Sequence, residues 1–134
     1  MIKTYQGTVY PWNCDHMNHM NVRFYVDKFD QATWNLLSFL DFSSKYLKES
    51  KTGMVVLEQK IKYLKEVLAG DNVIVKSEIT EIKDKIIYFK QNMINFESNE
   101  LVSTNEVIGL HIDSIKRKGI LIPEFAKLKA NETK

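Results

Sequence analysis

The chain has 134 residues, the size of one domain, and we expect a single domain over residues 1–134. Its 44% hydrophobic and 27% charged residues are typical of a globular protein, and five glycines and two prolines exclude collagen-like and disordered classes. Nineteen Lys and Arg oppose seventeen Asp and Glu. The net charge of +2 gives no electrostatic basis for binding nucleic acid or a membrane surface.

Cys14 is the only cysteine, which excludes an intrachain disulfide and a cysteine-rich zinc site. The first residues contain no apolar core of a signal peptide. No apolar run approaches the roughly 20 residues that are needed to span a bilayer. We therefore expect a cytoplasmic protein.

The first expected strand is Lys3–Tyr10, and Pro11 ends it because proline cannot donate to a sheet ladder. A polar segment follows. From Val22 to Leu40, apolar residues recur with the three- and four-residue spacing of a helix about five turns long. Asn21, directly before this run, is a candidate N-cap.

After a polar link with room for a short helix, the hydrophobic pattern changes to the alternation of strands. The expected strands, separated by turns at 69–72, 83–85 and 97–100, are Val55–Tyr63, Val73–Lys83, Ile86–Phe96 and Leu101–Ile112. A further short piece is expected within 117–122. The lysine-rich tail after Phe125 is expected to fray.

One strand, one long helix and at least four further strands indicate an α+β fold. The apolar stripe of the helix is wide enough that we expect Phe29, Trp34 and Phe39 in the core. Because only one long helix is available, an antiparallel sheet of five or more strands wrapped around this central helix buries it best. The open sheet edges favour pairing with a second copy of the chain.

Polar residues concentrate before the long helix, in the run Asn13-Cys14-Asp15-His16-Met17-Asn18-His19-Met20-Asn21. This run adjoins a helix N-terminus, where free N–H groups and the positive dipole end favour a negative oxygen. A carboxylate in such a loop can act as a nucleophile or as a general base on water. A carbonyl docked on the helix N–H groups is polarised as charge develops. Asp15 and the helix end therefore predict an acyl-transfer site.

The same residues also have structural interpretations. Asp15 can cap the turn or the helix. His16, His19 and the distant His111 raise the alternative of a metal site, but the spacing of helical zinc ligands is absent and we expect no metal. Cys14 is expected to be a buried, inert thiol, because neighbouring side chains of an extended segment point in opposite directions.

The residues from Val9 to Tyr25 resemble the signature D-x-x-G-H-[VM]-N-x-x-x-Y of hotdog-fold acyl-CoA thioesterases, the 4-hydroxybenzoyl-CoA thioesterase-like family. The residues that match in identity and spacing are Asp15, His19, Met20, Asn21 and Tyr25. Asn18 stands where the family has glycine, and asparagine also tolerates a left-handed backbone. The order of the expected strands is similar to the hotdog order over nearly the whole chain, so the resemblance implies that fold.

This resemblance implies an enzyme that hydrolyses a small or medium acyl-CoA thioester to the free acid and CoA, with no cofactor. It implies that Asp15 is the catalytic carboxylate, and we expect His19 to order the loop or position that acid. The backbone N–H near Val22 would hold the thioester oxygen. The expected substrate-binding residues are Asn18, Asn21, Val22, Tyr25, Lys83 and Lys85. The family also implies a groove between subunits, and we expect a homodimer or homotetramer.

Several alternatives stay open. Tyr25 is either a core aromatic or a wall of the acyl pocket. Relatives place basic residues near Lys83 and Lys85 against the nucleotide phosphates, but solvated turn lysines are the simpler interpretation. The alternative function is a non-catalytic acyl-CoA-binding domain on the same fold. A hydratase or dehydratase that pairs Asp15 with His19 ranks lowest.

The residues around Pro11 and Trp12 also resemble thioesterases that act on betainyl-CoA. Trp12 and Trp34 are then candidates for an aromatic cage around a quaternary ammonium group. Core packing explains both indoles as well.

Overall fold

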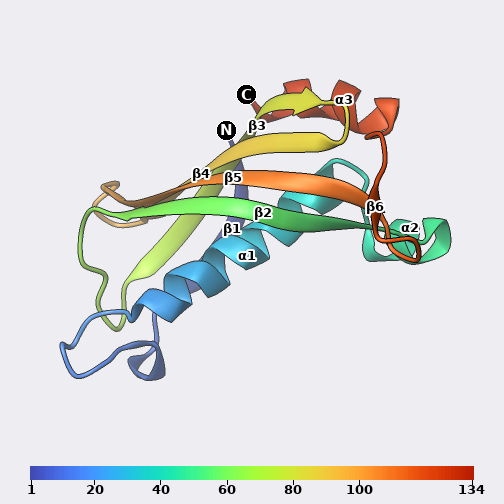
Figure 1. Ribbon diagram of the computed structural model, residues 1–134. Helices are drawn as coiled ribbons and strands as arrows, with labels where there is room; N and C mark the ends of the chain where they lie inside the picture. Colours follow the sequence, from blue (N-terminus) through green and yellow to red (C-terminus); the bar gives the residue numbers. More distant parts are fainter.

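The computed structural model describes all 134 residues and contains one curled sheet with a long helix packed across one face (Figure 1). Its strands are β1 (Ile2–Thr8), β2 (Thr52–Tyr63), β3 (Asn72–Lys83), β4 (Ile86–Asn95), β5 (Leu101–Asp113) and β6 (Lys118–Gly119). They lie in the order β1-β3-β4-β5-β2, with β6 paired to β5, and every pair is antiparallel. The helical segments are α1 (Val22–Phe39), α2 (Ser44–Ser50), α3 (Glu124–Ala130), η1 (Pro11–Asn13) and η2 (Asn131–Thr133).

The long helix α1 positions the site because its N-terminus adjoins the polar loop. Asn21 caps it by accepting a hydrogen bond from the Arg23 N–H at 3.1 Å. Its buried stripe consists of Tyr25, Phe29, Ala32, Leu36 and Leu37, with Lys28 beside them. Each large apolar side chain of that stripe contributes about 1.5–3 kcal/mol by leaving water. None of the helices combines the length and the apolarity that crossing a bilayer requires.

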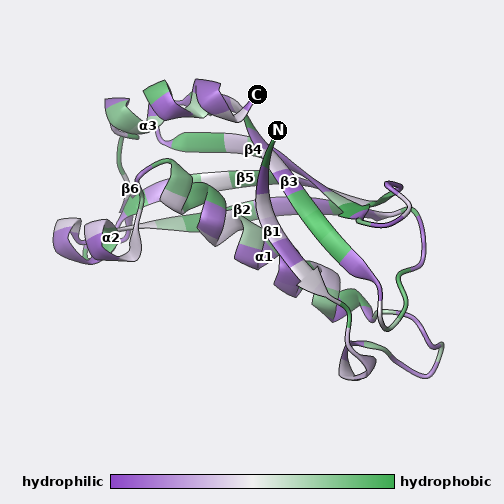
Figure 2. Cartoon of the chain, turned by 180° about the vertical axis from the view of Figure 1, so that it is seen from behind, coloured by the Kyte–Doolittle hydropathy of each residue, from purple (hydrophilic) through white to green (hydrophobic).

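The predicted helix and the predicted strands are confirmed, but the prediction that Trp34 lies in the core is wrong. Its side chain is 52% exposed, whereas Phe29 is buried and Phe39 is half-buried. Trp34 stands two residues after Ala32 and two before Leu36, which places it on the opposite side of α1 from the stripe that meets the sheet. The hydropathy colouring of Figure 2 shows polar and apolar residues alternating in this way along α1.

The expectation that the tail frays is also wrong. Residues 124–133 form α3 and η2, which pack against β3. Ala126 and Ala130, one helical turn apart, are buried in the same cluster as Leu36 and Ile79. Ile79 pairs with Phe89 of β4 directly before a bulge, and its N–H donates to the Thr133 hydroxyl at 2.8 Å. Small alanines and one buried hydroxyl therefore hold a segment whose lysines suggested disorder.

The second edge of the sheet is β2, which pairs only with β5. Its exposed apolar side chains are Val55, Val56, Leu57 and Tyr63. A bulge between Val56 and Glu58 sets Leu57 outside the regular register. A long edge strand with unpaired backbone groups and apolar side chains is a template for pairing with another chain.

The Thr133 hydroxyl gives the first test. Replacing Thr133 by valine leaves the buried Ile79 N–H without an acceptor, so the free energy of unfolding falls by about 1–3 kcal/mol. Thr133→Ser keeps the hydroxyl and loses less than half of that. Urea denaturation followed by circular dichroism measures both, and equal stabilities of the two variants would contradict the role of this hydrogen bond.

Candidate active site

The polar loop before α1 closes on itself through its backbone. The Asp15 N–H donates to the His19 carbonyl at 3.2 Å, and the Asn18 N–H donates to the Asp15 carbonyl at 2.9 Å. Cys14 and Met20 form an antiparallel bridge at the base of the loop. Asn18 has a φ of 62°, the left-handed conformation expected for the position where the family has glycine.

Two further backbone bonds fix the loop to its surroundings. The Asn21 N–H donates to the Asn13 carbonyl at 2.8 Å, which joins the end of the loop to η1. The Met20 N–H donates to the Val67 carbonyl at 2.7 Å, which joins the loop to the segment between β2 and β3. The loop is therefore held against the α1 N-terminus and the far end of β2 together.

Both carboxylate oxygens of Asp15 accept hydrogen bonds. The Asn21 side-chain amide donates to Oδ2 at 2.9 Å, and the Met17 N–H donates to Oδ1 at 2.9 Å. The Asn21 bond first, then the Met17 bond, and then the nearby His19 and His16 hold the pKa of Asp15 below its ordinary value of 3.8. The side chain is 24% exposed. Asp15 is therefore a partly shielded and ionised carboxylate at neutral pH.

Asn21 joins this carboxylate to the helix end. Its oxygen accepts the Arg23 N–H while its amide donates to Asp15, so one side chain serves as cap and as acid partner. The neighbouring Val22 N–H has no acceptor within the chain, and Val22 is 55% exposed. A free amide at the positive end of an 18-residue helix is a donor for a negative oxygen.

His19 lies between two carboxylates. Its Nε2 is 3.8 Å from Asp15 Oδ1, and its Nδ1 is 3.2 Å from Glu66 Oε1. No pattern in the sequence indicated Glu66, which is 47 residues from His19 and belongs to no motif. Glu66 orients the imidazole when Nδ1 carries a proton, because the carboxylate oxygen can only accept that hydrogen bond.

Beside His19 lies a cavity of about 240 Å³. Its walls come from the start of α1 and the end of β2, and it is lined by His19, Met20, Val22, Tyr25, Tyr63, Leu64, Lys65 and Glu66. Asp15 does not line it, but its Oδ1 lies 3.8 Å from Nε2 of His19, which does. The cavity places an apolar wall next to the free Val22 amide.

Tyr25 is both a core residue and a wall of this cavity. Its side chain is 5% exposed, and its ring meets the Tyr63 ring edge-on at 5.0 Å. Burial first, and then the neighbouring Tyr63 and Glu66, raise the pKa of Tyr25 to about 12. Tyr25 therefore keeps its proton at neutral pH.

Lys83 and Lys85 do not join this cavity within one protomer. They flank the turn between β3 and β4, while the other end of β3 adjoins the loop through the 67–72 segment. The twelve residues of β3 separate the two ends by about 36 Å at about 3.3 Å per residue. Asn18 is exposed at the surface of the loop and lines no cavity described here.

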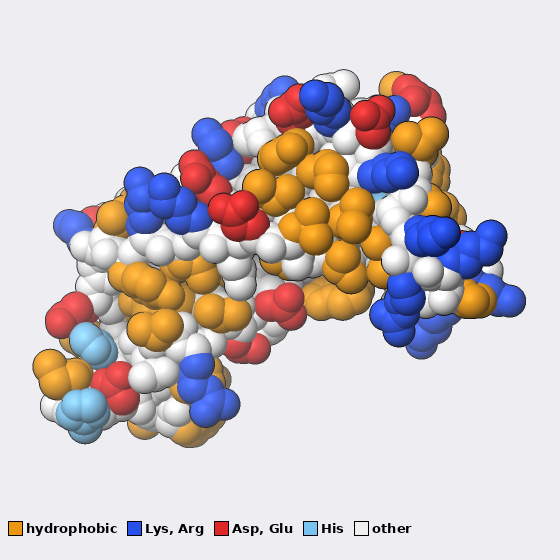
Figure 3. Space-filling model, in the orientation of Figure 1, with side chains coloured by type: hydrophobic (Ala, Val, Ile, Leu, Met, Phe, Trp, Pro, Cys, Tyr) orange, Lys and Arg blue, Asp and Glu red, His pale blue; other side chains and the backbone are white.

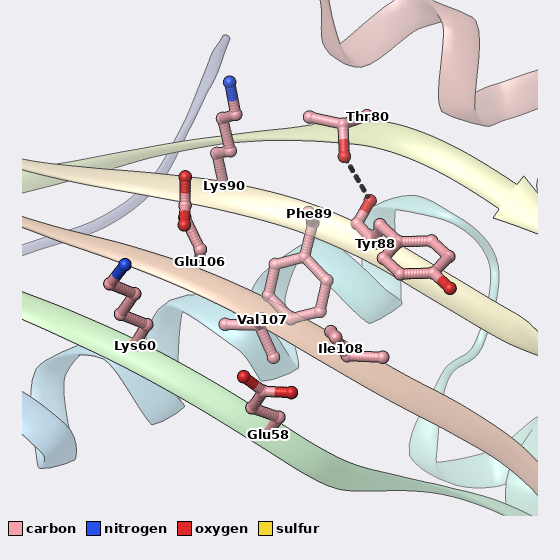
Figure 4. Close-up of a pocket in the computed structure, with 9 residues that line it drawn as sticks. All are labelled: Glu58, Lys60, Thr80, Tyr88, Phe89, Lys90, Glu106, Val107 and Ile108. Carbon is pink, nitrogen blue, oxygen red and sulfur yellow. Dashed lines mark hydrogen bonds between the residues drawn. The ribbon is translucent and has the colours of Figure 1, made fainter.

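The outer face of the sheet carries another hollow, of about 230 Å³ (Figure 4). Glu58 lies there among the exposed Lys60, Lys90 and Glu106, and Thr80 donates to the Tyr88 carbonyl nearby. Glu58 stands opposite Ile108 and forms no ion pair. No helix end adjoins this hollow to polarise a carbonyl.

The remaining residues of the sequence hypotheses lie apart. No group of three or more His, Cys, Asp or Glu side chains gathers as metal ligands would. His111 is buried, with Nδ1 3.1 Å from the Leu121 carbonyl oxygen. Cys14 is half-buried rather than fully buried. Trp12 stacks on Tyr10 beside the loop with ring centroids 4.6 Å apart, while Trp34 lines a different cavity.

Comparisons with known proteins point to one family. A family model described as the thioesterase-like superfamily matches residues 9–129. The acyl-CoA thioester hydrolase YbgC of Escherichia coli is 26% identical over 100 residues, which cover 75% of this chain and 74% of that protein. The L-carnitine dehydrogenase/betainyl-CoA thioesterase of a Rhizobium species is 25% identical over 118 residues, or 87% of this chain and 24% of that one.

Solved structures agree with this assignment. The protein SAV2348 of Staphylococcus aureus, solved in complex with CoA, has a TM-score of 0.88 and 26% identity, covering 99% of this chain and 85% of that one. The DHNA-CoA thioesterase of the same species has a TM-score of 0.84 and 21% identity, covering 100% and 97%. The predicted hotdog fold is confirmed.

The double role of Asn21 can be separated by substitution. Asn21→Ala removes the cap and the amide donor, whereas Asn21→Ser keeps a capping oxygen and removes the longer amide group that reaches Asp15. We expect the Asp15 pKa to rise in both variants, and the free energy of unfolding to fall by about 1 kcal/mol in the alanine variant and less in the serine variant. Carboxyl NMR titration and urea denaturation measure the two effects.

The pH dependence follows from the direction of the shift. A carboxyl with a lowered folded pKa stabilises the fold above its unfolded pKa and loses that contribution as the pH falls through the folded pKa. The stability gap between wild type and Asn21→Ser therefore narrows as the pH falls below about 4. A gap that stays constant from pH 7 to pH 2 would show that the amide does not act on Asp15.

Proposed function

Because the chain belongs to the thioesterase-like superfamily, we propose that it hydrolyses an acyl-CoA thioester with Asp15 as the catalytic carboxylate. The observation that carries the proposal is the ionised Asp15, hydrogen-bonded to the side chain that caps α1, beside a cavity that adjoins the free Val22 amide. The relative YbgC is named as an acyl-CoA thioester hydrolase, and SAV2348 was solved in complex with CoA. Both observations support acyl-CoA as the substrate class.

In the proposed reaction, the thioester carbonyl oxygen lies on the Val22 N–H, where the helix dipole stabilises the negative charge that develops in the transition state. Asp15 either accepts a proton from the attacking water or attacks the carbonyl itself to give an anhydride that water opens. In both routes a C–O bond forms and the C–S bond breaks. One water is consumed, and the products are the carboxylic acid and the CoA thiol.

The other residues have supporting roles in this proposal. His19 positions Asp15, and the contact with Glu66 holds the imidazole in place. Asn21 orients the carboxylate. Tyr25 forms the wall against which the acyl group packs, and its protonated hydroxyl adds no charge to that wall. Asn18 gives the loop its left-handed turn.

We further propose that two copies pair along β2. The exposed Val55, Val56 and Leu57 leave an apolar edge, and α1 presents Val22, Val26 and Trp34 on the side that does not meet the sheet. A second copy placed by a two-fold axis would cover both rows at once and extend the sheet through antiparallel β2 strands. The cavity at the end of β2 would then lie at the boundary between the copies.

Release of free thiol from a panel of acyl-CoAs tests the reaction. The panel includes short, long, aromatic and cationic acyl groups. We expect Asp15→Asn and Asp15→Ala to lower kcat by about a hundredfold or more, since each removes the acting carboxylate. Asp84→Asn is the matched control, because it makes the same exchange in the exposed turn at the other end of β3.

Melting temperatures of all variants come first, because Asp15 also organises its loop. Folded Asp15 variants with wild-type rates would refute the catalytic assignment. CoA esters that raise the melting temperature of wild type without any thiol release would support the non-catalytic acyl-CoA-binding alternative instead.

A charged substitution in the edge strand β2 tests the pairing of the two copies. Val56→Glu places two like charges close together in a two-fold β2 contact, and we expect it to give monomers. Leu128→Glu, which changes an exposed leucine on α3, keeps the wild-type assembly. Sedimentation velocity measures the mass. A wild-type monomer at micromolar concentration would overturn the pairing.

A further inference from the structure

The outer face of the sheet, which α1 does not cover, carries apolar side chains over the half of the sheet nearest α2. Cross-strand pairing places Leu110 between Val55 and Ile86, and it places Ile108 beside Tyr88 one row further along the strands. We call these five side chains the outer patch. Figure 3 shows hydrophobic side chains gathered over this half of the sheet, and Figure 4 shows Tyr88 and Ile108 lying side by side.

The outer patch lies outside the hydrophobic core. Val55 is 38% exposed, and the other four side chains of the patch are half-buried. The residues next to them along the strands, such as Phe89 and Val107, point to the opposite face and are buried with the apolar residues of α1. A contiguous apolar area with a charged rim on the surface of a chain marks a contact with another protein.

The charges at the β3 side of the outer patch follow a defined order. Pairing with β4 places Glu81 beside Tyr88, and it places Lys83 beside Ile86. Lys85 follows in the turn to β4, and it is exposed like Glu81 and Lys83. None of these three charged side chains forms an ion pair within the chain. This border of the patch is therefore acidic toward the middle of β3 and basic toward its end.

The proposed β2 pairing determines how a second face fits this patch. Antiparallel β2 strands are related by a two-fold axis perpendicular to the sheet, at the middle of the strand. Two sheet faces that meet are related by an axis in the plane of contact, which runs either across the strands or along them. Two axes that cross at right angles close an assembly of four chains, whereas axes that miss each other give an open filament.

Only the axis across the strands closes the assembly. The rows of the outer patch include Val55 and the position opposite Glu58, near the middle of β2, so an axis across the strands through the patch meets the β2 axis. An axis along the strands would follow β5, at the centre of the patch, and would miss the free edge of β2.

Charge complementarity at the β3 border agrees with this axis. A two-fold axis across the strands reverses the strand direction of the second copy. Glu81 of one copy is then directed toward the basic end of β3, with Lys83 and Lys85, in the other copy, and the same contact occurs twice. The apolar centres of the two patches meet between these charges.

We propose that the outer patch is the contact between two β2-paired dimers, which pack sheet against sheet as a tetramer with α1 of every copy on the outside. The inference goes beyond the proposed hydrolysis and rests on the proposed β2 pairing. It assigns a second copy of this chain, and no other partner, to the outer face of the sheet.

The size of the patch explains why pairing along β2 comes first. Four strands about 4.8 Å apart span about 15 Å, so one patch covers on the order of a few hundred Å². That is well below the roughly 800 Å² per partner of a stable contact. A β2-paired dimer presents two outer patches on the same face, so both contacts form in one association. A single chain, with one patch, stays monomeric at micromolar concentration.

A charge in the centre of the patch tests the contact. Ile108→Glu would bury a carboxylate against the apolar patch of the other copy, and we expect sedimentation velocity to give dimers where the wild type gives tetramers. Phe96→Glu is the matched control, because it changes an exposed apolar residue beyond the other end of β4, and it keeps the tetramer. Melting temperatures confirm that both variants are folded. Tetramers of folded Ile108→Glu would overturn the contact.

Exchange of charges tests the axis without touching the apolar centre. Glu81→Lys places cations against cations, and Lys83→Glu with Lys85→Glu places acids against acids. We expect each of these two variants to raise the dissociation constant of the tetramer into dimers about tenfold or more. The variant with all three exchanges restores opposite charges across the contact, so its dissociation constant returns toward the wild-type value. A triple variant that dissociates as readily as the other two would overturn the axis.

The mass of the assembly separates this inference from the β2 pairing on which it rests. A wild-type dimer that Val56→Glu splits and Ile108→Glu does not would keep the β2 pairing and overturn the contact through the outer patch. A wild-type dimer that only Ile108→Glu splits would keep the outer contact and overturn the β2 pairing. Thiol release from acyl-CoA depends on Asp15 and is measured separately, so its outcome leaves both conclusions about assembly unchanged.

Discussion

The geometry of the candidate site depends on one side chain, Asn21, which joins a helix end to a carboxylate. Its side-chain oxygen accepts the Arg23 N–H in the first turn of α1, and its side-chain amide donates to the Asp15 carboxylate. A residue that only capped the helix could be serine or aspartate, but aspartate has no donor and the serine hydroxyl stands one bond closer to the backbone than the Asn21 amide nitrogen. The bond also fixes where Asp15 lies relative to the free Val22 amide. Acid and amide therefore keep a fixed geometry before any substrate arrives.

The same hydrogen bonds limit what Asp15 can do alone. A carboxylate with a lowered pKa stays ionised, but it is a weaker base and a weaker nucleophile than an unpaired one. In the proposed reaction, polarisation of the carbonyl by the helix end would therefore supply much of the acceleration, and such polarisation acts most strongly where water is excluded. The cavity beside His19 is open on the β2 side in the single chain, because Tyr63 and Leu64 are about half exposed. A covering copy would lower the local dielectric at the place where charge develops.

The sequence predicted what local rules control. The period of α1 and its Asn21 cap follow from residue type and spacing, and the alternating strands follow from their patterns. The left-handed Asn18 was indicated by the resemblance, because the family has glycine at that position. Predictions failed where the structure depends on a contact between residues that are far apart in the sequence. The tail is held in place by the hydrogen bond from the Ile79 N–H to the Thr133 hydroxyl. Trp34 is exposed because it lies on the side of α1 that faces away from the sheet. Glu66 joins His19 through a loop that carries no motif. Such contacts depend on how the sheet curls, which no local pattern specifies.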